Sequence, residues 1–157
     1  NSMTDSAHLL AGDIAPHILL EMGLTASFHE LLRGYKKDHR FSYYIDSGDC
    51  NEEHIDTNTK LILYRLIKDL LHEIVYTYRA DLLIIVMRVI GNELEFLIQD
   101  NGGDIDLAEI ISTGLYIERS HMLGLSETLR LIGGSVRVIK SQDMNSTCLT
   151  VPLQIQL

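Results

Sequence analysis

Two carboxylates spaced four residues apart are the first residues whose types suit chemistry. Asp69 and Glu73 fall in a series with Arg65 and Thr77 at intervals of four, which is the spacing of side chains along one face of a helix. Carboxylate oxygens so arranged can coordinate Mg²⁺ or accept a proton as a general base. Taken alone, the pair is more simply a solvated helix face. Its function therefore depends on the element that carries it.

A polar loop offers a second candidate site. Residues 100–104 read Asp-Asn-Gly-Gly-Asp directly after a run of β-forming residues. Such a run needs a positive φ angle somewhere and is by itself a turn signal. Its position after a hairpin makes the Asp100 carboxylate a candidate hydrogen-bond acceptor for a ligand.

Histidines and cysteines do not add a metal site. The seven histidines lack ligand spacing, and His72 lies near the carboxylate pair without a defined role. Cys50 and Cys148 are too far apart for a metal knuckle and too few for a disulfide scaffold. Two cysteines fit a reducing compartment, and we expect both to be buried or idle thiols. No local motif marks a catalytic triad.

Hydrophobic periodicity predicts the helices that position these residues. Apolar residues in a 3.6-residue rhythm predict one helix over residues 16–37, with a break near Gly23. Thr57 or Asn58 can cap the strongest helix, which continues to Tyr78 and so carries the carboxylate pair on its polar face.

Alternating residues predict the strands and, with the helices, the fold. Gly91-Asn92 suits a tight hairpin turn. The remaining predicted elements are a strand over 40–45, a hairpin of strands 82–90 and 93–99, a weak helix over 107–117, a helix over 120–132 and a closing hairpin of strands 135–140 and 147–156. Their order predicts a two-layer α/β sandwich, in which helices cover one face of a mixed sheet.

In order and spacing, these motifs resemble the ATP-binding catalytic domain of sensor histidine kinases, whose superfamily includes gyrase, a heat-shock chaperone and mismatch-repair ATPases. The resemblance rests on residues 63–73, on Asp-Asn-Gly at 100–102 after a hairpin, and on a helix ending in Gly133-Gly134. Residues 14–24 and the Leu-Tyr-Arg start of 63–73 further resemble the subfamily paired with helix-turn-helix response regulators. The likeness runs from about residue 14 to the end.

The resemblance implies roles for the carboxylate pair. The family has Glu, three residues and then Asn on this helix, and the corresponding residues are Asp69 and Glu73. Asp69 would then act as catalytic base or orienting group, and Glu73 would hold Mg²⁺. A carboxylate in place of the amide adds repulsion toward a triphosphate, on the order of 1 kcal/mol or more. The Lys-His pair usual in the next turn is Tyr76-Thr77, so a compensating cation is missing.

The family loop reads Asp, any residue, Gly, any residue, Gly. By resemblance, Asp100 would accept a hydrogen bond from the adenine amino group, and Gly102 would shape the loop. The second glycine position is Asp104. Either Gly103 substitutes in a shifted loop, or a Cβ and another negative charge block close approach to the base.

A glycine-rich phosphate cradle should precede the third helix, with a nucleotide lid between residues 107 and 119. Without gaps, the family glycines fall on Arg119, His121 and Gly124; with a three-residue deletion, residues 123–125 would form the phosphate turn. We favour the ungapped alignment because Glu127 then also falls in place. Either alignment makes a poor cradle, with Gly124 as its expected nucleotide contact.

Composition sets the class of protein. With 157 residues, 46% hydrophobic and 22% charged, the chain is expected to form one folded domain over residues 16–157, preceded by an N-terminal segment or cloning remnant over 1–15. A net charge of -9 argues against a nucleic-acid groove. We expect no transmembrane segment and no signal peptide, because apolar runs fall short of the roughly 20 residues that span a bilayer.

Two functions remain open from the sequence. The first is an ATP- and Mg²⁺-binding catalytic domain of a cytoplasmic two-component kinase, free or within a membrane-anchored or larger signalling protein. Its partners would be a phosphoacceptor His segment or dimerisation helices, and a response regulator. The second is a non-catalytic regulatory or dimerising module that keeps the fold without binding ATP. The departures at Glu73, Asp104 and residues 119–121 all weaken anion binding and slightly favour the second.

Overall fold

The structure is a computed structural model that describes residues 17–48, 50–103, 125–141 and 143–153. The strands are β1 (Ser42–Asp46), β2 (Leu82–Ile90), β3 (Glu93–Asp100), β4 (Ser135–Lys140) and β5 (Asn145–Pro152). The helices are α2 (Leu24–Asp38), α3 (Thr57–His72) and α5 (Leu125–Leu131), joined by a 3₁₀ turn η1 (Glu52–His54) and a π-helical turn η2 (Glu73–Thr77). Residues 17–22 are also helical.

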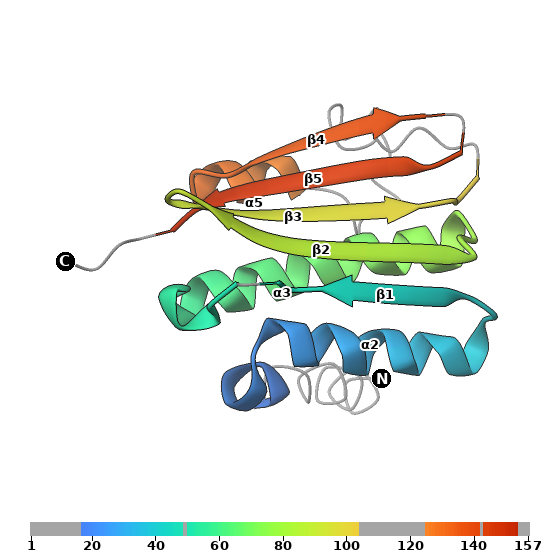
Figure 1. Ribbon diagram of the computed structural model, residues 1–157, viewed down its shortest axis with the longest axis horizontal. Helices are drawn as coiled ribbons and strands as arrows, with labels where there is room; N and C mark the ends of the chain where they lie inside the picture. Colours follow the sequence, from blue (N-terminus) through green and yellow to red (C-terminus); the bar gives the residue numbers. More distant parts are fainter. Residues whose placement is uncertain (1–16, 49, 104–124, 142, 154–157) are drawn as a thin grey trace, which may run out of the picture.

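The sheet is mixed, and the helices cover one of its faces. Its strand order is β1-β2-β3-β5-β4, in which β1 pairs with β2 in parallel and every other pair is antiparallel. Figure 1 shows α3 and α5 behind the strands, and α2 along the β1 edge. The predicted two-layer α/β sandwich is therefore confirmed.

Alternation along the strands directs apolar side chains to the helical layer. The buried residues of the central strands are Leu83, Ile85 and Met87 of β2 and Leu94, Phe96 and Ile98 of β3. Phe28 of α2 joins the layers, because its ring stacks on Tyr64 of α3 at 5.6 Å and meets Phe96 edge-on at 6.1 Å. Aromatic pairs at these distances add to the free energy gained by burial.

The first helix breaks where the sequence predicts. Gly23 has a φ of +93°, which separates the helical residues 17–22 from α2. The start of α2 is capped from a distant segment, since Glu52 of η1 accepts hydrogen bonds from the backbone N–H groups of Leu24 and Thr25. A carboxylate at a helix N-terminus offsets the unpaired donors and the positive end of the helix dipole.

The second helix differs from its prediction at both ends. Its N-cap is Asp56, rather than Thr57 or Asn58: the Asp56 Oδ1 accepts from the Thr59 N–H at 2.9 Å. Regular α-helix ends at His72, and η2 follows with a wider turn. The side-chain column predicted at intervals of four therefore does not continue regularly to Thr77.

Hairpins account for the remaining strands. The β2–β3 hairpin is confirmed, and Gly91 at its turn has a φ of +60°. The first strand begins at Ser42 rather than residue 40, and the last begins at Asn145 rather than Thr147. The third helix is described from residue 125 onward and ends as predicted at Gly133, whose φ is +77°. Here the N–H groups of Gly133 and Gly134 donate to the carbonyls of Arg130 and Leu129, which closes the helix.

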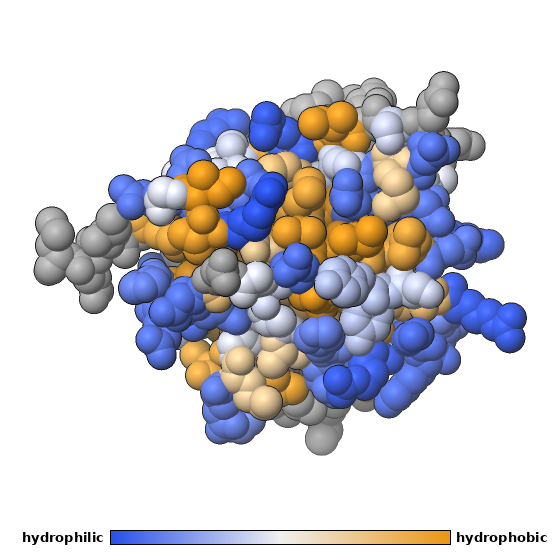
Figure 2. Space-filling model, viewed as in Figure 1, coloured by the Kyte–Doolittle hydropathy of each residue, from blue (hydrophilic) through white to orange (hydrophobic). Residues whose placement is uncertain are grey.

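The sheet face opposite the helices carries apolar side chains as well. Figure 2 shows hydrophobic residues gathered across the strands on this face. Among the exposed large side chains of the strands, Tyr44 of β1 is 63% exposed and Ile139 of β4 is 60% exposed. Among the described residues, no helix combines the length and apolar character needed to cross a membrane.

Candidate functional site

Asp100 lies at the end of β3 with its side chain in the interior. The residue is 0% exposed. Its Oδ1 accepts from the backbone N–H of Gly102 at 2.8 Å and from the side-chain amide of Asn145 at 3.2 Å. Its Oδ2 is also buried but has no hydrogen-bond partner among the residues that the structure describes. A buried acceptor left without a donor is costly, which marks this oxygen as available for a ligand.

Burial raises the pKa of the Asp100 carboxyl above its usual value. The Gly102 N–H and the Asn145 amide lower this pKa and so oppose the effect, but burial is the larger influence. A desolvated carboxylate of this kind gains from any donor that reaches it. Perturbed carboxyl groups in clefts are common at functional sites.

Asn145 is a site residue that sequence reasoning did not identify. It is the first residue of β5, and β5 pairs with β3 so that Asn145 lies opposite Asp100. Its Nδ2 donates to the Asp100 Oδ1 and to the Gly102 carbonyl, both at 3.2 Å. Asn145 therefore holds both the carboxylate and the loop after it. Only the strand register could have identified it, because the two residues lie 45 positions apart.

Gly102 is required by close packing. A Cβ at this position would lie 2.9 Å from both the Asp100 Oδ1 and the Tyr78 Cβ. The following N–H, from Gly103, donates to the Tyr78 carbonyl at 2.9 Å. The loop is thus pressed against the end of η2. A Cβ at Gly103 would meet only the Tyr78 carbonyl, at 3.7 Å.

Asn101 fastens the same loop to the start of β2. Its Oδ1 accepts from the N–H groups of Asp81 at 2.7 Å and Leu82 at 2.9 Å. The position that the family pattern leaves unspecified therefore has a structural role in this chain. Asn101 and Asn145 support Asp100 from opposite sides.

The predicted metal ligand Glu73 is buried rather than solvated. Along the column, Arg65 is exposed, Asp69 is half-buried and Glu73 is only 5% exposed. Glu73 begins η2, and its carbonyl accepts from the Tyr78 N–H at 3.0 Å. Tyr78 packs against Gly102, so the π-helical turn connects Glu73 to the Asp100 loop. Such turns are frequent at functional sites. The simpler reading of the pair as a solvated face is wrong for Glu73.

Tyr76, at a position where the family pattern has a basic residue, packs against α2. The Tyr76 ring stacks on His72 at 4.5 Å, and His39 meets it edge-on at 4.3 Å. The Tyr76 hydroxyl donates to Asp38 at 3.2 Å. Tyr76 therefore ties η2 to the end of α2.

Several predicted positions lie outside the described residues. They are Gly124, Asp104, the alternative glycine positions 119 and 121, the weak helix over 107–117 and the lid over 107–119. Within the described ranges, no group of three or more His, Cys, Asp or Glu side chains is placed to hold a metal ion. The thiols agree with expectation in part, since Cys148 is buried and Cys50 is half-buried, and both are free.

Comparison with known proteins finds relatives by structure alone. No protein-family model matches the chain, and no curated protein matches its sequence. The blue-light activated histidine kinase of Erythrobacter litoralis superposes with a TM-score of 0.72 at 14% identity, over 98% of this chain and 50% of that one.

Two further histidine kinases give the same result. The histidine kinase AdeS of Acinetobacter baumannii superposes with a TM-score of 0.63 at 11% identity, over 99% of this chain and 82% of its own. The catalytic domain of histidine kinase ThkA superposes with a TM-score of 0.57 at 14% identity, over 80% of this chain and 91% of its own. The chain therefore has the fold found in the catalytic domains of histidine kinases.

Proposed function

We propose that the chain binds an adenine nucleotide and that Asp100 recognises the base. The observation that carries this proposal is the buried Asp100 Oδ2, which finds no hydrogen-bond donor within the described part of the chain. The exocyclic amino group of adenine is a donor of the kind this oxygen needs. A hydrogen bond to an ionised acceptor is about twice as strong as a neutral one. Asn145 and Gly102 hold the other carboxylate oxygen, so the free oxygen keeps a defined position.

The same geometry favours adenine over guanine. Guanine presents a carbonyl oxygen where adenine presents its amino group, and an ionised carboxylate repels that oxygen. A site built to hydrogen-bond one group discriminates strongly against an analogue that lacks it. We expect ATP and ADP to bind, and GTP to bind more weakly.

We expect Mg²⁺ to be held through few protein ligands. Mg²⁺ is commonly held by one or two carboxylates, with phosphate oxygens and water completing its shell. Glu73 would supply one carboxylate oxygen from η2, and Asp69, one turn earlier, would act as base or orienting group. Mg²⁺ would offset charge on the phosphate oxygens. The metal would be needed all the more with a carboxylate at position 73. Without Mg²⁺, the Glu73 carboxylate and the phosphates would repel each other.

We assign this role to residues 16–157, as part of a cytoplasmic two-component signalling protein. Phosphate would pass to a His on a phosphoacceptor segment or on dimerisation helices, and then to a response regulator. The second candidate is a regulatory module without catalysis. The buried Glu73 on a π-helical turn favours that candidate, because a carboxylate occupies the position of the family's metal-binding amide.

Thermal unfolding with nucleotide tests the binding proposal. A ligand at a hundred times its Kd stabilises the native state by about 2.7 kcal/mol, which raises Tm by several degrees in a domain of this size. We expect this rise with ATP or ADP and Mg²⁺, a smaller rise with GTP, and none with the Asp100→Asn variant. An unchanged Tm in the unmodified chain at millimolar ATP would contradict the proposal.

Phosphotransfer separates the two candidates. Radiolabelled ATP is supplied with a phosphoacceptor His segment, and Glu73→Asn is compared with the unmodified chain. Labelling of the segment by the unmodified chain supports the kinase. ATP binding without labelling, together with a clear gain in ATP affinity for Glu73→Asn, supports the regulatory module.

A further inference from the structure

Basic residues gather at one corner of this acidic protein. Arg33, Lys36, Lys37 and Arg40 fall within eight residues, in a chain whose net charge is -9. The first three lie on the last two turns of α2 at spacings that share one face of a helix, and Arg40 follows the helix end. All four are exposed. The corner therefore presents a row of positive charge to solvent.

Of these four side chains, Arg33 alone forms an ion pair with a carboxylate of the described residues. Arg33 pairs with Glu30 at 2.9 Å. Among the described residues, no carboxylate forms an ion pair with Lys36, Lys37 or Arg40. The Lys36 ammonium instead lies over the Tyr43 ring, 5.8 Å from its centre. This cation–π contact holds the charge beside β1.

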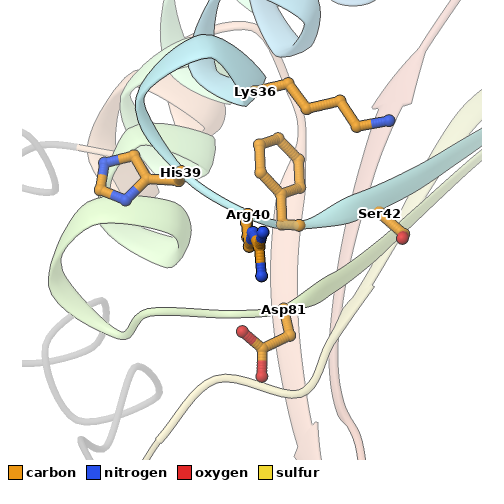
Figure 3. Close-up of a pocket in the computed structure, with 6 residues that line it drawn as sticks. Lys36, His39, Arg40, Ser42 and Asp81 are labelled. Carbon is orange, nitrogen blue, oxygen red and sulfur yellow. The ribbon is translucent and has the colours of Figure 1, made fainter.

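The row borders a cavity of about 490 Å³, lined by Lys36, His39, Arg40, Phe41, Ser42 and Asp81. Figure 3 shows Arg40 between Lys36 and Asp81, with the Lys36 side chain extending above β1 toward Ser42. Phe41 is buried beneath, whereas Lys36, Arg40, Ser42 and Asp81 are exposed. The cavity is therefore open to solvent, and its lining does not include the residues of the Asp100 loop.

The backbone around this cavity is well tied. The Ser42 N–H donates to the Asp81 carbonyl at 2.8 Å, and the Asp81 N–H donates to the Asn101 side chain at 2.7 Å. His39 is held against the Tyr76 ring, and Asp38 accepts from the Tyr76 hydroxyl. The charged side chains thus project from a fixed frame.

The mixture of charges points to a peptide rather than a phosphate ion. Lys36 and Arg40 suit carboxylates. The Asp81 carboxylate in the same cavity would repel a phosphate dianion, which offers it no hydrogen-bond donor. An acidic peptide offers both groups, because its side chains carry carboxylates and its backbone carries N–H donors. The row from Arg33 to Lys37 alone extends about 6 Å along the helix axis, and Arg40 lengthens it, which also suits an extended ligand.

We infer that the corner formed by the end of α2 and the starts of β1 and β2 is a docking site for an acidic peptide segment of a protein partner. Carboxylates of the segment contact Lys36, Lys37 and Arg40, and its backbone donates to Asp81. Charge complementarity of this kind steers association and falls with salt. The inference does not depend on nucleotide binding.

A labelled polyglutamate peptide tests the site by fluorescence anisotropy at low ionic strength. We expect binding that weakens with added salt and by about tenfold in the double variant Lys36→Glu, Arg40→Glu. The matched control is Arg65→Glu, Arg137→Glu, which makes the same charge change at exposed positions on α3 and β4. Equal weakening in the two double variants, or no binding to the unmodified chain, overturns the inference.

Two further measurements test where the peptide binds and whether the corner prefers a peptide to other anions. In the unmodified chain, peptide should shift the amide NMR signals of Ser42 and Asp81, which does not depend on any variant folding. Inorganic phosphate or an oligothymidine that binds the corner more tightly than the peptide overturns the assignment to an acidic peptide. Asp100→Asn should leave peptide binding unchanged, so that loss of nucleotide binding and loss of docking are distinguishable.

Discussion

At the scale of residues, the site depends on a few side chains that hold one carboxylate in place. One carboxylate oxygen of Asp100 accepts hydrogen bonds from Gly102 and Asn145. The other is buried and receives no hydrogen bond from the described residues. Asn101 holds the neighbouring backbone. A buried carboxylate oxygen without a donor lowers stability, a cost that functional sites commonly carry. Two substitutions test this balance.

Asp100→Asn should raise the free energy of unfolding at pH 7 by about 1 kcal/mol while removing nucleotide binding. An acid whose pKa is raised on folding favours the native state below its unfolded pKa, and loses that advantage as pH rises through the native pKa. The raised pKa of Asp100 is therefore a penalty at neutral pH, which asparagine removes. Urea unfolding at pH 7 and near pH 4 measures the gain, which should shrink at the lower pH. A less stable variant at pH 7 would refute this account.

Gly102→Ala should lower the free energy of unfolding by roughly 1–3 kcal/mol, because overpacking forces shifts of this cost. The new Cβ would lie 2.9 Å from the Asp100 Oδ1 and from the Tyr78 Cβ. Gly103→Ala is the matched control, since its Cβ meets only the Tyr78 carbonyl at 3.7 Å. Chemical denaturation measures both. Equal effects of the two substitutions would show that close packing is not the cause.

At the scale of elements, helix ends decide where the site residues lie. Asp56 starts α3, and a π-helical turn extends it, so that Glu73 enters the interior. The start of α2 depends on Glu52 from a different segment. Caps of this kind fix the residue at which each helix begins.

Asp56→Ala should cost about 1 kcal/mol at pH 7, the usual value for losing an N-cap. The Thr59 backbone N–H, and then its hydroxyl, hold the Asp56 pKa below its usual value. An acid whose pKa is lowered on folding stabilises the native state above its unfolded pKa. This stabilisation is lost as pH falls through the native pKa. The difference between variant and unmodified chain should therefore narrow below about pH 4. Thermal unfolding across pH measures it, with Asn58→Ala as a neighbouring change that keeps the cap; a constant difference would argue against the carboxylate.

At the scale of the whole molecule, one aromatic side chain joins the layers, and the Asp100 loop and the basic corner share the same structural framework. Phe28 touches α3 and β3, and no part of its side chain is exposed. The Asp100 loop and the basic corner near Asp81 are connected through Asn101, whose side chain accepts a hydrogen bond from the backbone N–H of Asp81. The structural framework of both regions thus depends on the same packed core.

Phe28→Ala should lower the free energy of unfolding by about 3–5 kcal/mol, because a large buried ring leaves a cavity. Met22→Ala is the control: Met22 is 70% exposed, and surface changes stay within about 0.5 kcal/mol. Denaturant titration measures both variants. Similar losses in the two would mean that Phe28 does not join the layers.

The sequence by itself determined the elements, their order and the fold class. Hydrophobic periodicity is local, so the β2–β3 hairpin, the break at Gly23 and the end of the third helix could be read directly. Family resemblance added Asp100 and Gly102 as candidates, and both lie together in the structure. The π-helical turn and the cap from Asp56 were missed although both are local.

Only the tertiary structure decided what surrounds the candidate residues. Asn145 reaches Asp100 from 45 positions away through strand register, and periodicity cannot report such a pairing. Glu73 is buried although its spacing matched a solvated face, because the turn that begins there packs against the Asp100 loop. Burial, unpaired acceptors and pKa shifts arise from contacts between distant segments. The chemistry at Asp100 is therefore a property of the fold, while the residues available to it are a property of the sequence.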